Sequence, residues 1–275
     1  MAASGGERRF LSIGTAPPGG AFFVIGGALA EVLNDFSGQD GWQFTAEATK
    51  GTKENIRRLS AGELDLALAN AAITYFAVRG GADWDRPYEM RTVMTMAPNV
   101  AMFLTVKSSG IETIADLAGK RVTVGPSGAG FVDFLTPILE AHGLGFEDFT
   151  SLNATQAGAV GMLADGSADA VYLGGVVPTA SVTQASTSQD IFFVPYDEAA
   201  MVTLTEQYPF FRRITLPAGT YRGMEEVFHG LVVGALHLIT AANVEEEFVY
   251  TVTRSLYESA EQVIERHGVG RSITA

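Results

Sequence analysis

Short apolar runs and segments of helical period alternate along the first part of the chain. The apolar runs at 10–13, 44–48 and 65–69 have the length of strands and are bounded by polar or turn-forming residues. The segments 21–34 and 53–60 instead carry apolar positions at helical spacing. The order strand, helix, strand, helix, strand predicts a parallel sheet with helices on both faces.

The same order of elements returns after a long extended apolar stretch at 92–106. The pattern predicts a strand at 121–124, helices at 131–142 and 155–164, and a further strand at 169–173. The sequence therefore predicts a second α/β segment built like the first.

Two matches between these segments indicate a degenerate internal repeat. The sequence GELDLA at 62–67 resembles GSADAV at 166–171, and GGAF at 19–22 resembles GAGF at 128–131. Either match alone is common wherever a helix, a glycine and a strand follow one another. Both matches in the same order predict two α/β lobes of similar construction.

The C-terminal part predicts one interlocked molecule rather than two domains joined by a linker. An apolar stretch at 230–240 predicts a return strand beside 100–106, and 244–267 reads as one long amphipathic helix. Two strands that cross between the lobes would form a hinge. The expected boundaries are 1–104 and 226–275 for lobe I and 105–225 for lobe II, with hinge segments near 98–106 and 226–236.

Composition and charge narrow the function classes. A chain of 275 residues with 47% hydrophobic residues can bury roughly 75% of its unfolded surface, so no disulfide or metal is needed to hold its core. The charge of −13, from 31 acidic and 18 basic residues, would repel phosphate backbones and argues against nucleic-acid binding. The absence of cysteine excludes thiol nucleophiles and thiolate zinc sites.

Membrane-spanning and export signals are not evident in the sequence. The longest apolar stretches, 21–33 and 231–242, are shorter than the ~20 residues of a spanning helix and contain Gly, Glu or His. The first nine residues lack the apolar core of a signal peptide and read as a leader ahead of a mature chain. They neither show nor refute export.

Two glycine-rich loops resemble catalytic motifs without carrying their chemistry. Gly14 and Gly19 have the spacing of a phosphate loop, but Gly20 and Ala21 stand where that loop needs Lys and Ser or Thr. The loop at 125–129 is one residue short of the nucleophile elbow of serine hydrolases. We therefore expect no catalytic residues.

The histidines give no metal or cofactor site. They are scattered, without ligand spacing or carboxylate partners, at 142, 229, 237 and 267. We expect surface or core roles for them, and no cofactor or metal.

Three loops that precede predicted helices can bind an anion. The loops at 14–20, 51–52 and 125–130 present unpaired backbone N–H groups at positive helix ends. In parallel sheets such loops lie beyond the carboxyl ends of the strands, and if two lobes face each other there, the loops converge on one cleft. The cleft would suit a small anion, above all a carboxylate; alternatively, the glycines only make tight turns. The hydroxyls in these loops belong to Thr15, Thr52 and Ser127.

Short blocks spread over residues 11–257 have an order and spacing found in one protein family. With them, the chain resembles the TAXI family, the solute-binding subunits of one branch of the tripartite ATP-independent periplasmic (TRAP) transporters. The blocks are Ile13-Gly14-Thr15, Gly19-Gly20, Ala48-Thr49, Gly51-Thr52, Glu54-Asn55, Ala61-Gly62-Glu63-Leu64-Asp65-Leu66-Ala67, Leu117-Ala118-Gly119-Lys120-Arg121-Val122, Gly125-Pro126-Ser127-Gly128, Asp169-Ala170, Gly175-Val176-Val177-Pro178 and Leu216-Pro217-Ala218-Gly219-Thr220-Tyr221.

The resemblance implies a two-lobed periplasmic-binding-protein fold, similar to type II, with two Rossmann-like lobes joined by hinge strands. It implies a periplasmic, non-enzymatic, monomeric protein whose signal peptide is removed. Such a protein closes on a small organic acid and delivers it to the permease subunits of an ion-driven transporter. Characterised family members favour glutamate-like amino acids or dicarboxylates such as 2-oxoglutarate.

Departures from the family pattern bear on the ligand. Phe22-Phe23 replaces a frequent Tyr-Tyr pair, Lys50 occupies a position that is usually small and uncharged, and Asn99 stands where an acidic residue is often found. If that acid holds an amino group, its absence disfavours amino acids. We expect an organic acid with an apolar or aromatic portion, or a short keto or dicarboxylic acid, rather than glutamate.

Alternative functions remain compatible with the sequence: a binding protein specific for glutamate or another amino acid, an enzyme on the same fold that uses Ser127 or Tyr172, or a sensor domain. The expected ligand contacts in the first lobe are Thr15, Gly20, Phe22, Lys50, Thr52 and Asn70. In the second lobe they are Ser127, Gly128, Ala129, Gly130, Tyr172 and Gly175.

Overall fold

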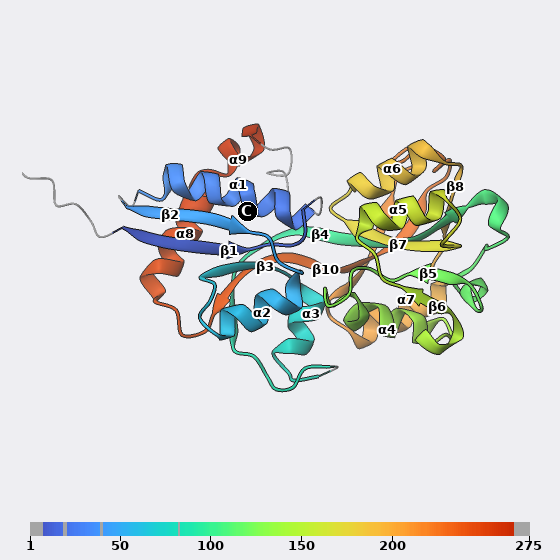
Figure 1. Cartoon of the computed structure of the whole chain (residues 1–275), viewed down its shortest axis with the longest axis horizontal. Helices are drawn as coiled ribbons and strands as arrows, with labels where there is room; N and C mark the ends of the chain where they lie inside the picture. Colours follow the sequence, from blue (N-terminus) through green and yellow to red (C-terminus); the bar gives the residue numbers. More distant parts are fainter. Residues whose placement is uncertain (1–7, 19–20, 39–40, 82, 267–275) are drawn as a thin grey trace, which may run out of the picture. The chain divides into compact units, whose positions relative to one another are not determined.

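The computed structural model describes residues 8–18, 21–38, 41–81 and 83–266. The chain forms two compact units, which we describe one at a time (Figure 1). Two strands and one helix contribute residues to both units: β4 (Met90–Val106), β10 (Phe228–Ala241) and α3 (Ala71–Ala77). Unit 1 comprises residues 1–70, 76–97 and 236–275, and unit 2 comprises residues 71–75 and 98–235.

Unit 1 is a β-α-β-α-β arrangement, as the hydrophobic pattern predicts. Strand β1 runs parallel to β2 on one side and to β3 on the other, and β10 joins β3 in antiparallel orientation. Helices α1 and α2 lie on opposite sides of these strands (Figure 1). The elements are β1 (Arg9–Gly14), α1 (Ala21–Phe36), β2 (Trp42–Glu47), α2 (Thr52–Ser60), β3 (Leu66–Asn70), α3 (Ala71–Ala77), β4 (Met90–Val106), β10 (Phe228–Ala241), α8 (Glu246–Glu258) and α9 (Ala260–Arg266).

Helix α1 supplies much of the core of unit 1. Its residues Ile25, Leu29 and Leu33 recur at helical spacing and are at most 1% exposed. Each such burial contributes roughly 1.5–3 kcal/mol to folding. The periodic segment at 21–34 therefore forms a helix because one of its faces is covered by the sheet and by α8, which packs against it.

Unit 2 has the same construction. Strand β5 runs parallel to β6 and β7, while β4 pairs with β7 and β8 in antiparallel orientation, and β9 pairs with β10. Helices α5 and α6 lie on one side of the strands, and α4 and α7 on the other (Figure 1). The elements are β5 (Arg121–Thr123), α4 (Phe131–Ala141), β6 (Thr150–Leu152), α5 (Gln156–Ala164), β7 (Ala170–Gly175), α6 (Ala180–Ser188), β8 (Ile191–Val194), α7 (Glu198–Gln207) and β9 (Phe211–Leu216).

The aspartates of the sequence repeat have the same structural role in both units. The Asp65 carboxylate accepts a hydrogen bond from Ser12 N at 2.8 Å, and the Asp169 carboxylate accepts one from Arg121 N at 2.8 Å. Each aspartate thus ties the start of the third strand to the first strand. The Arg121 guanidinium also donates to Asp169 at 2.6 Å and lowers the pKa of that carboxyl.

The C-terminal helix differs from the single helix predicted at 244–267. The structure has two helices, α8 and α9, separated at Ser259, whose backbone leaves the helical range at φ −108° and ψ 14°. Both helices contact α1, and Ser259 is 3% exposed, so the break lies in packed surroundings. Periodicity alone continued through this position because the apolar spacing on either side is similar.

His142 joins two helices of unit 2 as a neutral ring. Its Nδ1 lies 2.7 Å from Ile138 O, and its Nε2 accepts a hydrogen bond of 3.0 Å from Asp197 N at the start of α7. An Nε2 that accepts carries no proton, so Nδ1 holds the hydrogen and donates it to the carbonyl. Burial lowers the pKa of His142, against opposing contributions from the Ile138 carbonyl and the nearby Asp197 carboxylate.

This arrangement predicts a loss of stability on acidification. The unfolded chain takes up a proton at His142 near pH 6.5, whereas the folded chain resists it, so the stabilisation present above that pH is lost as the pH falls below it. In urea unfolding between about pH 7.5 and about pH 5, His142→Gln should lose less stability than the wild type. His237, whose pKa burial also lowers, leaves a residual dependence. Equal pH slopes for the two proteins would contradict the assignment.

Candidate functional site

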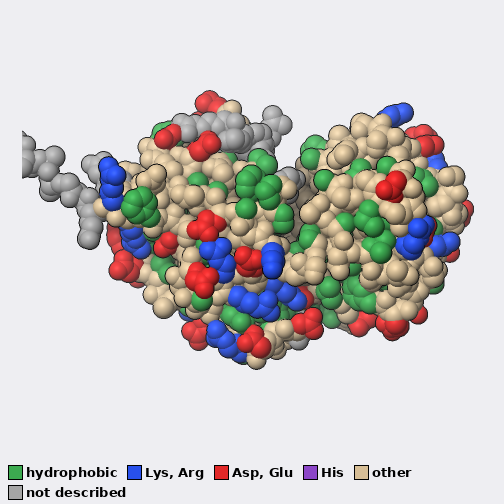
Figure 2. All heavy atoms as spheres, viewed as in Figure 1, with side chains coloured by type: hydrophobic (Ala, Val, Ile, Leu, Met, Phe, Trp, Pro, Cys, Tyr) green, Lys and Arg blue, Asp and Glu red, His purple; other side chains and the backbone are tan. Residues whose placement is uncertain are grey.

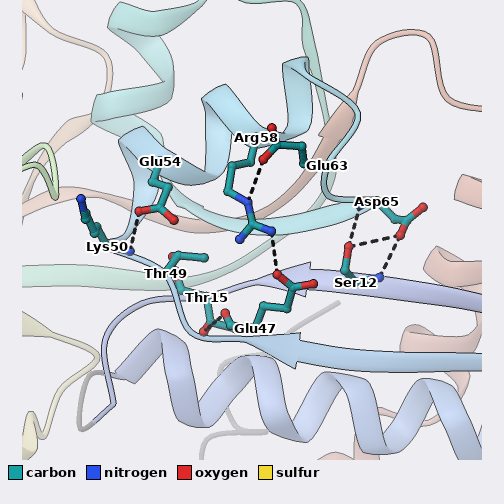
Figure 3. A network of polar contacts seen from close by, with 9 residues as sticks. All are labelled: Ser12, Thr15, Glu47, Thr49, Lys50, Glu54, Arg58, Glu63 and Asp65. Atoms are coloured by element: carbon teal, nitrogen blue, oxygen red, sulfur yellow. Dashed lines mark hydrogen bonds and ion pairs between the residues drawn. The ribbon is translucent and has the colours of Figure 1, made fainter.

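In unit 1, the segment after β1 is tied to the end of β2. The Thr15 hydroxyl donates to Glu47 O at 2.7 Å, and its backbone N–H donates to the same carbonyl at 3.0 Å. Thr49 Oγ1 donates to Thr15 O at 3.0 Å and accepts from Gly51 N at 3.1 Å. Thr15 is 0% exposed, so its hydroxyl positions the loop from inside (Figure 3).

Asn55 joins the residue that follows β1 to the middle of β3. Its Nδ2 donates 2.8 Å hydrogen bonds to Thr15 O and to Leu68 O. The side chain is fully buried, and a Cβ at Gly14 would lie 2.8 Å from its Oδ1 and 2.5 Å from Leu64 Cδ1. Glycine is therefore required at position 14 because Asn55 and Leu64 occupy the space of a side chain.

Thr52 connects the first turn of α2 to the end of β3. Its Oγ1 accepts a hydrogen bond of 3.1 Å from Asn70 N, and both residues are buried. Gly51, the residue before the helix, has φ 113°, which favours glycine. At this edge of unit 1, Thr15 is thus bonded to Thr49 and Asn55, and Thr52 is bonded to Asn70.

Lys50 is the exposed cation of this edge. Its backbone N–H donates to Glu54 Oε2 at 3.1 Å, while its side chain extends away from the network drawn in Figure 3. In the same network, Arg58 donates to Glu47 at 2.7 Å and to Glu63 at 3.3 Å. Basic and acidic side chains lie next to each other over this part of unit 1 in Figure 2. The Lys50 ammonium has no ion-pair partner within 4 Å among the described residues.

In unit 2, the loop after β5 is tied to the loop after β6. Gly125 O accepts hydrogen bonds from Asn153 Nδ2 at 3.1 Å and from Ala154 N at 3.3 Å. Gly125 has φ 92°, and a Cβ there would collide with the ring of Phe131. The loop then leads through exposed Ser127 to the start of α4.

The predicted residues of this loop divide into two classes. Ser127 and Gly128 are exposed, whereas Ala129 and Gly130 are buried. Gly130 precedes α4 with φ 95°, and no side chain caps that helix start. Backbone N–H groups and one serine hydroxyl are therefore what this loop offers to a ligand.

Tyr172 lies in the core of unit 2. It is 1% exposed, and its ring packs on Phe103 at 4.6 Å and on Phe134 at 6.2 Å between centroids. Burial raises the pKa of Tyr172 well above its ordinary value, and the neighbouring Tyr196 adds to the effect. Its side chain stabilises β7, whereas Gly175 ends that strand.

Two predicted residues remain. Phe22 is half-exposed in the first turn of α1. Gly20 lies outside the described residues.

Sequence reasoning missed several residues that hold these edges together. Asn153 and Gln156 follow β6, and Tyr221 OH accepts a hydrogen bond of 2.8 Å from Thr179 N before α6. Asn55 and Thr49 stood in the family blocks, without an assigned role. The signal for them is an amide or hydroxyl residue at or just before the first turn of a helix that follows a strand.

The described part of the chain holds no cluster of three or more His, Asp or Glu residues able to bind a metal. Of the helices with described residues, none is long and apolar enough to cross a membrane.

A sequence model of the NMT1-like family matches residues 13–275. Among solved structures, the chain is similar to the substrate-binding protein of an amino acid ABC transporter, with 14% identity, 94% of this chain and 98% of that one covered, and a TM-score of 0.55. The chain is also similar to the periplasmic aliphatic sulphonate binding protein from Escherichia coli, with 18% identity, 93% of this chain and 72% of that one covered, and a TM-score of 0.53. The effector-binding domain of a BenM variant has 16% identity to the chain, with 95% of this chain and 97% of that one covered, and a TM-score of 0.53. These similarities show the α/β fold of periplasmic binding proteins, as the sequence predicts.

The network around Asn55 predicts a severe effect of one isosteric substitution. Asn55→Asp keeps the shape but directs a buried carboxylate at two carbonyl oxygens, so the free energy of unfolding should fall by about 3–5 kcal/mol. Urea unfolding followed by circular dichroism measures the loss. Asn243→Asp, at an exposed position of unit 1, adds the same charge and should stay within about 0.5 kcal/mol of the wild type. Equal unfolding midpoints for the two variants would refute the role of Asn55.

Proposed function

The chain belongs to the NMT1-like family, and we propose that it is a solute-binding protein that captures a small organic acid for a membrane transporter. The fold is shared with binding proteins of amino acids and sulphonates, but a fold alone does not fix a ligand. The proposal therefore depends on the chemistry of the loops at the carboxyl ends of the parallel strands.

One observation carries the proposal. The loops at 14–20, 48–51, 124–130, 153–155 and 174–179 contain a single charged residue, Lys50, in a chain with a net charge of −13. They otherwise offer hydroxyls, amides and backbone N–H groups at helix starts. Such groups stabilise a carboxylate locally, by about 0.3–1 kcal/mol for each helix end, and more when partly buried.

We propose that the ligand contacts loops of both units and that its binding favours a closed arrangement of them, with hinge segments near 98–106 and 226–236. Closure gains only from contacts that the open form lacks. Lys50, Phe22, Ser127 and Gly128 supply groups that a ligand can reach, because they are exposed or half-exposed. Thr15, Thr52, Asn70 and Tyr172 support the loops from within.

The transporter is proposed to be of the TRAP type. The sequence blocks that resemble the TAXI family support this assignment, with membrane permease subunits as partners and a periplasmic location for a monomeric, non-catalytic protein. A solved structural neighbour belongs to an ABC transporter, so that class is the alternative. Uptake abolished by an ionophore but not by depletion of ATP would support the TRAP assignment.

The ligand is proposed to be an organic acid without an amino group. Phe22 and Phe23 offer apolar rings in place of two hydroxyls, and Asn99 replaces an acidic residue frequent in the family. A keto acid, a dicarboxylate or an acid with an aromatic portion fits these features. Glutamate is the competing ligand.

A sensor domain is the second candidate function. The effector-binding domain of a BenM variant is similar over 95% of this chain, so the fold is shared with a domain that binds an effector. A sensor requires a signalling partner, whereas an uptake protein releases its ligand unchanged to a permease.

The proposal predicts stabilisation by carboxylates in a thermal-shift screen. Pyruvate, succinate, 2-oxoglutarate, phenylacetate and glutamate form the panel, with succinamide as an uncharged control. A ligand at about 100 times its Kd stabilises the folded protein by about 2.7 kcal/mol. We expect at least one of the four non-amino acids to stabilise the protein and succinamide to have no effect. Binding of glutamate alone would overturn the ligand class, and no shift with any acid would overturn the function.

If the Lys50 ammonium contacts the ligand, carboxylate binding should depend on its charge. Lys50→Gln should weaken carboxylate binding about tenfold or more in calorimetry, because it removes a charged donor. Lys107→Gln is the matched control, since Lys107 is exposed and its ammonium lies 3.2 Å from Asp190. Unchanged affinity in Lys50→Gln would remove Lys50 from the proposed site.

A further inference from the structure

The repeat aligns two hydrogen-bonding side chains that the sequence motifs did not connect. Residues 52–70 and 156–174 correspond without a gap, and α2 and α5, at their starts, each contain nine residues. Along this alignment Asp65 corresponds to Asp169, whose matching roles are described above. In the same alignment Gln156 corresponds to Thr52.

The two aligned residues make the same bond. Thr52 Oγ1 accepts from Asn70 N at 3.1 Å, and Gln156 Oε1 accepts at 3.2 Å from the N–H of Gly174, the residue aligned with Asn70. In both units the first residue of the second helix therefore holds the end of the third strand. A chance contact does not explain the same bond at the same aligned positions.

Gln156 does more in unit 2 than Thr52 does in unit 1. Strand β5 ends at Thr123, opposite Val171, so β7 continues beyond it with no strand on that side among the described residues. Gln156 fills this place: its Nε2 donates to Gly174 O at 2.7 Å while its Oε1 accepts from Gly174 N. The carboxamide pairs with Gly174 as a neighbouring strand would.

The orientation of the carboxamide is fixed. Ser181 Oγ, in the first turn of α6, also donates to Gln156 Oε1, at 2.7 Å. The opposite orientation would direct the NH₂ group at Gly174 N–H and the oxygen at Gly174 O. Three hydrogen bonds thus leave one Nε2 hydrogen without a partner in the described part of the chain.

We propose that Gln156 positions the end of β7 and the start of α6, and that its remaining amide hydrogen is a donor to an oxygen of the ligand. The donor role rests on the proposed function, whereas the positioning role does not. Gln156 is half-buried and lies at the start of α5, among the loops that follow the parallel strands. An uncharged donor there recognises a carboxylate, carbonyl or hydroxyl oxygen.

Hydrogen exchange tests the positioning role without any ligand. In Gln156→Met, which keeps the length of the side chain, the Gly174 amide should exchange about tenfold faster or more, since it loses its acceptor. Amides of β7 that pair with β4 provide the internal reference. Unchanged exchange at Gly174, or an equal rise at every β7 amide, would overturn the role.

Ligand affinity tests the donor role. Pyruvate, 2-oxoglutarate and phenylacetate are the probes, and Gln156→Glu should weaken the binding of any of them about tenfold or more at about pH 7.5, through repulsion and loss of the donor. The affinity relative to the wild type should recover only in part near about pH 4, because protonation removes the repulsion but leaves a single O–H, which pairs with Gly174 O. Gln184→Glu, exposed on α6, adds the same charge and should bind like the wild type.

The outcomes separate the two proposals. Equal binding by Gln156→Glu and the wild type would overturn the donor role while leaving the proposed function intact. Failure of all three probes to bind the wild type would overturn the proposed function for these acids and the donor role with it. The exchange of Gly174 then still decides the positioning role.

Discussion

The end of the third strand in each unit is the constraint on which the candidate site depends. In unit 1, β1 pairs with β3 only as far as Ala67, so β3 continues to Asn70 beyond the end of its neighbour. Buried backbone groups need partners. Side chains from the second helix supply them: Asn55 and Thr52 in unit 1, and Gln156 in unit 2. The loops that follow take their positions from these bonds.

The charge of the chain and the chemistry of its loops act at different ranges. A net charge of −13 acts on the surface, where salt screens it beyond about 8–10 Å. The carboxylates of Asp65 and Asp169 lie at the amino ends of β3 and β7, where they accept hydrogen bonds from backbone N–H groups. The loops at the carboxyl ends hold one lysine and no acid, so the net charge of the chain does not contradict the proposed binding of an anion there.

The shared fold separates architecture from ligand. The fold is shared, at 14–18% identity, with the substrate-binding protein of an amino acid ABC transporter, a sulphonate-binding protein and an effector-binding domain. Parallel strands followed by helices always place helix starts at one edge of the sheet, so the edge recurs while its side chains vary. In this chain the edge carries Phe22, Lys50 and Gln156.

The sequence by itself determined the order of the elements, because short apolar runs and helical spacing each report one covered face. It also determined the repeat. Gly62 and Gly166 both have positive φ (73° and 76°), and Asp65 and Asp169, three residues later, tie the third strand of each unit to the first. Only the tertiary structure decided which polar residues support the loops. Thr15 and Tyr172 were predicted as ligand contacts and are buried, and the bond of Gln156 to Gly174 joins residues that lie eighteen positions apart in the sequence. Hydrogen bonds between distant segments depend on packing, which periodicity does not encode.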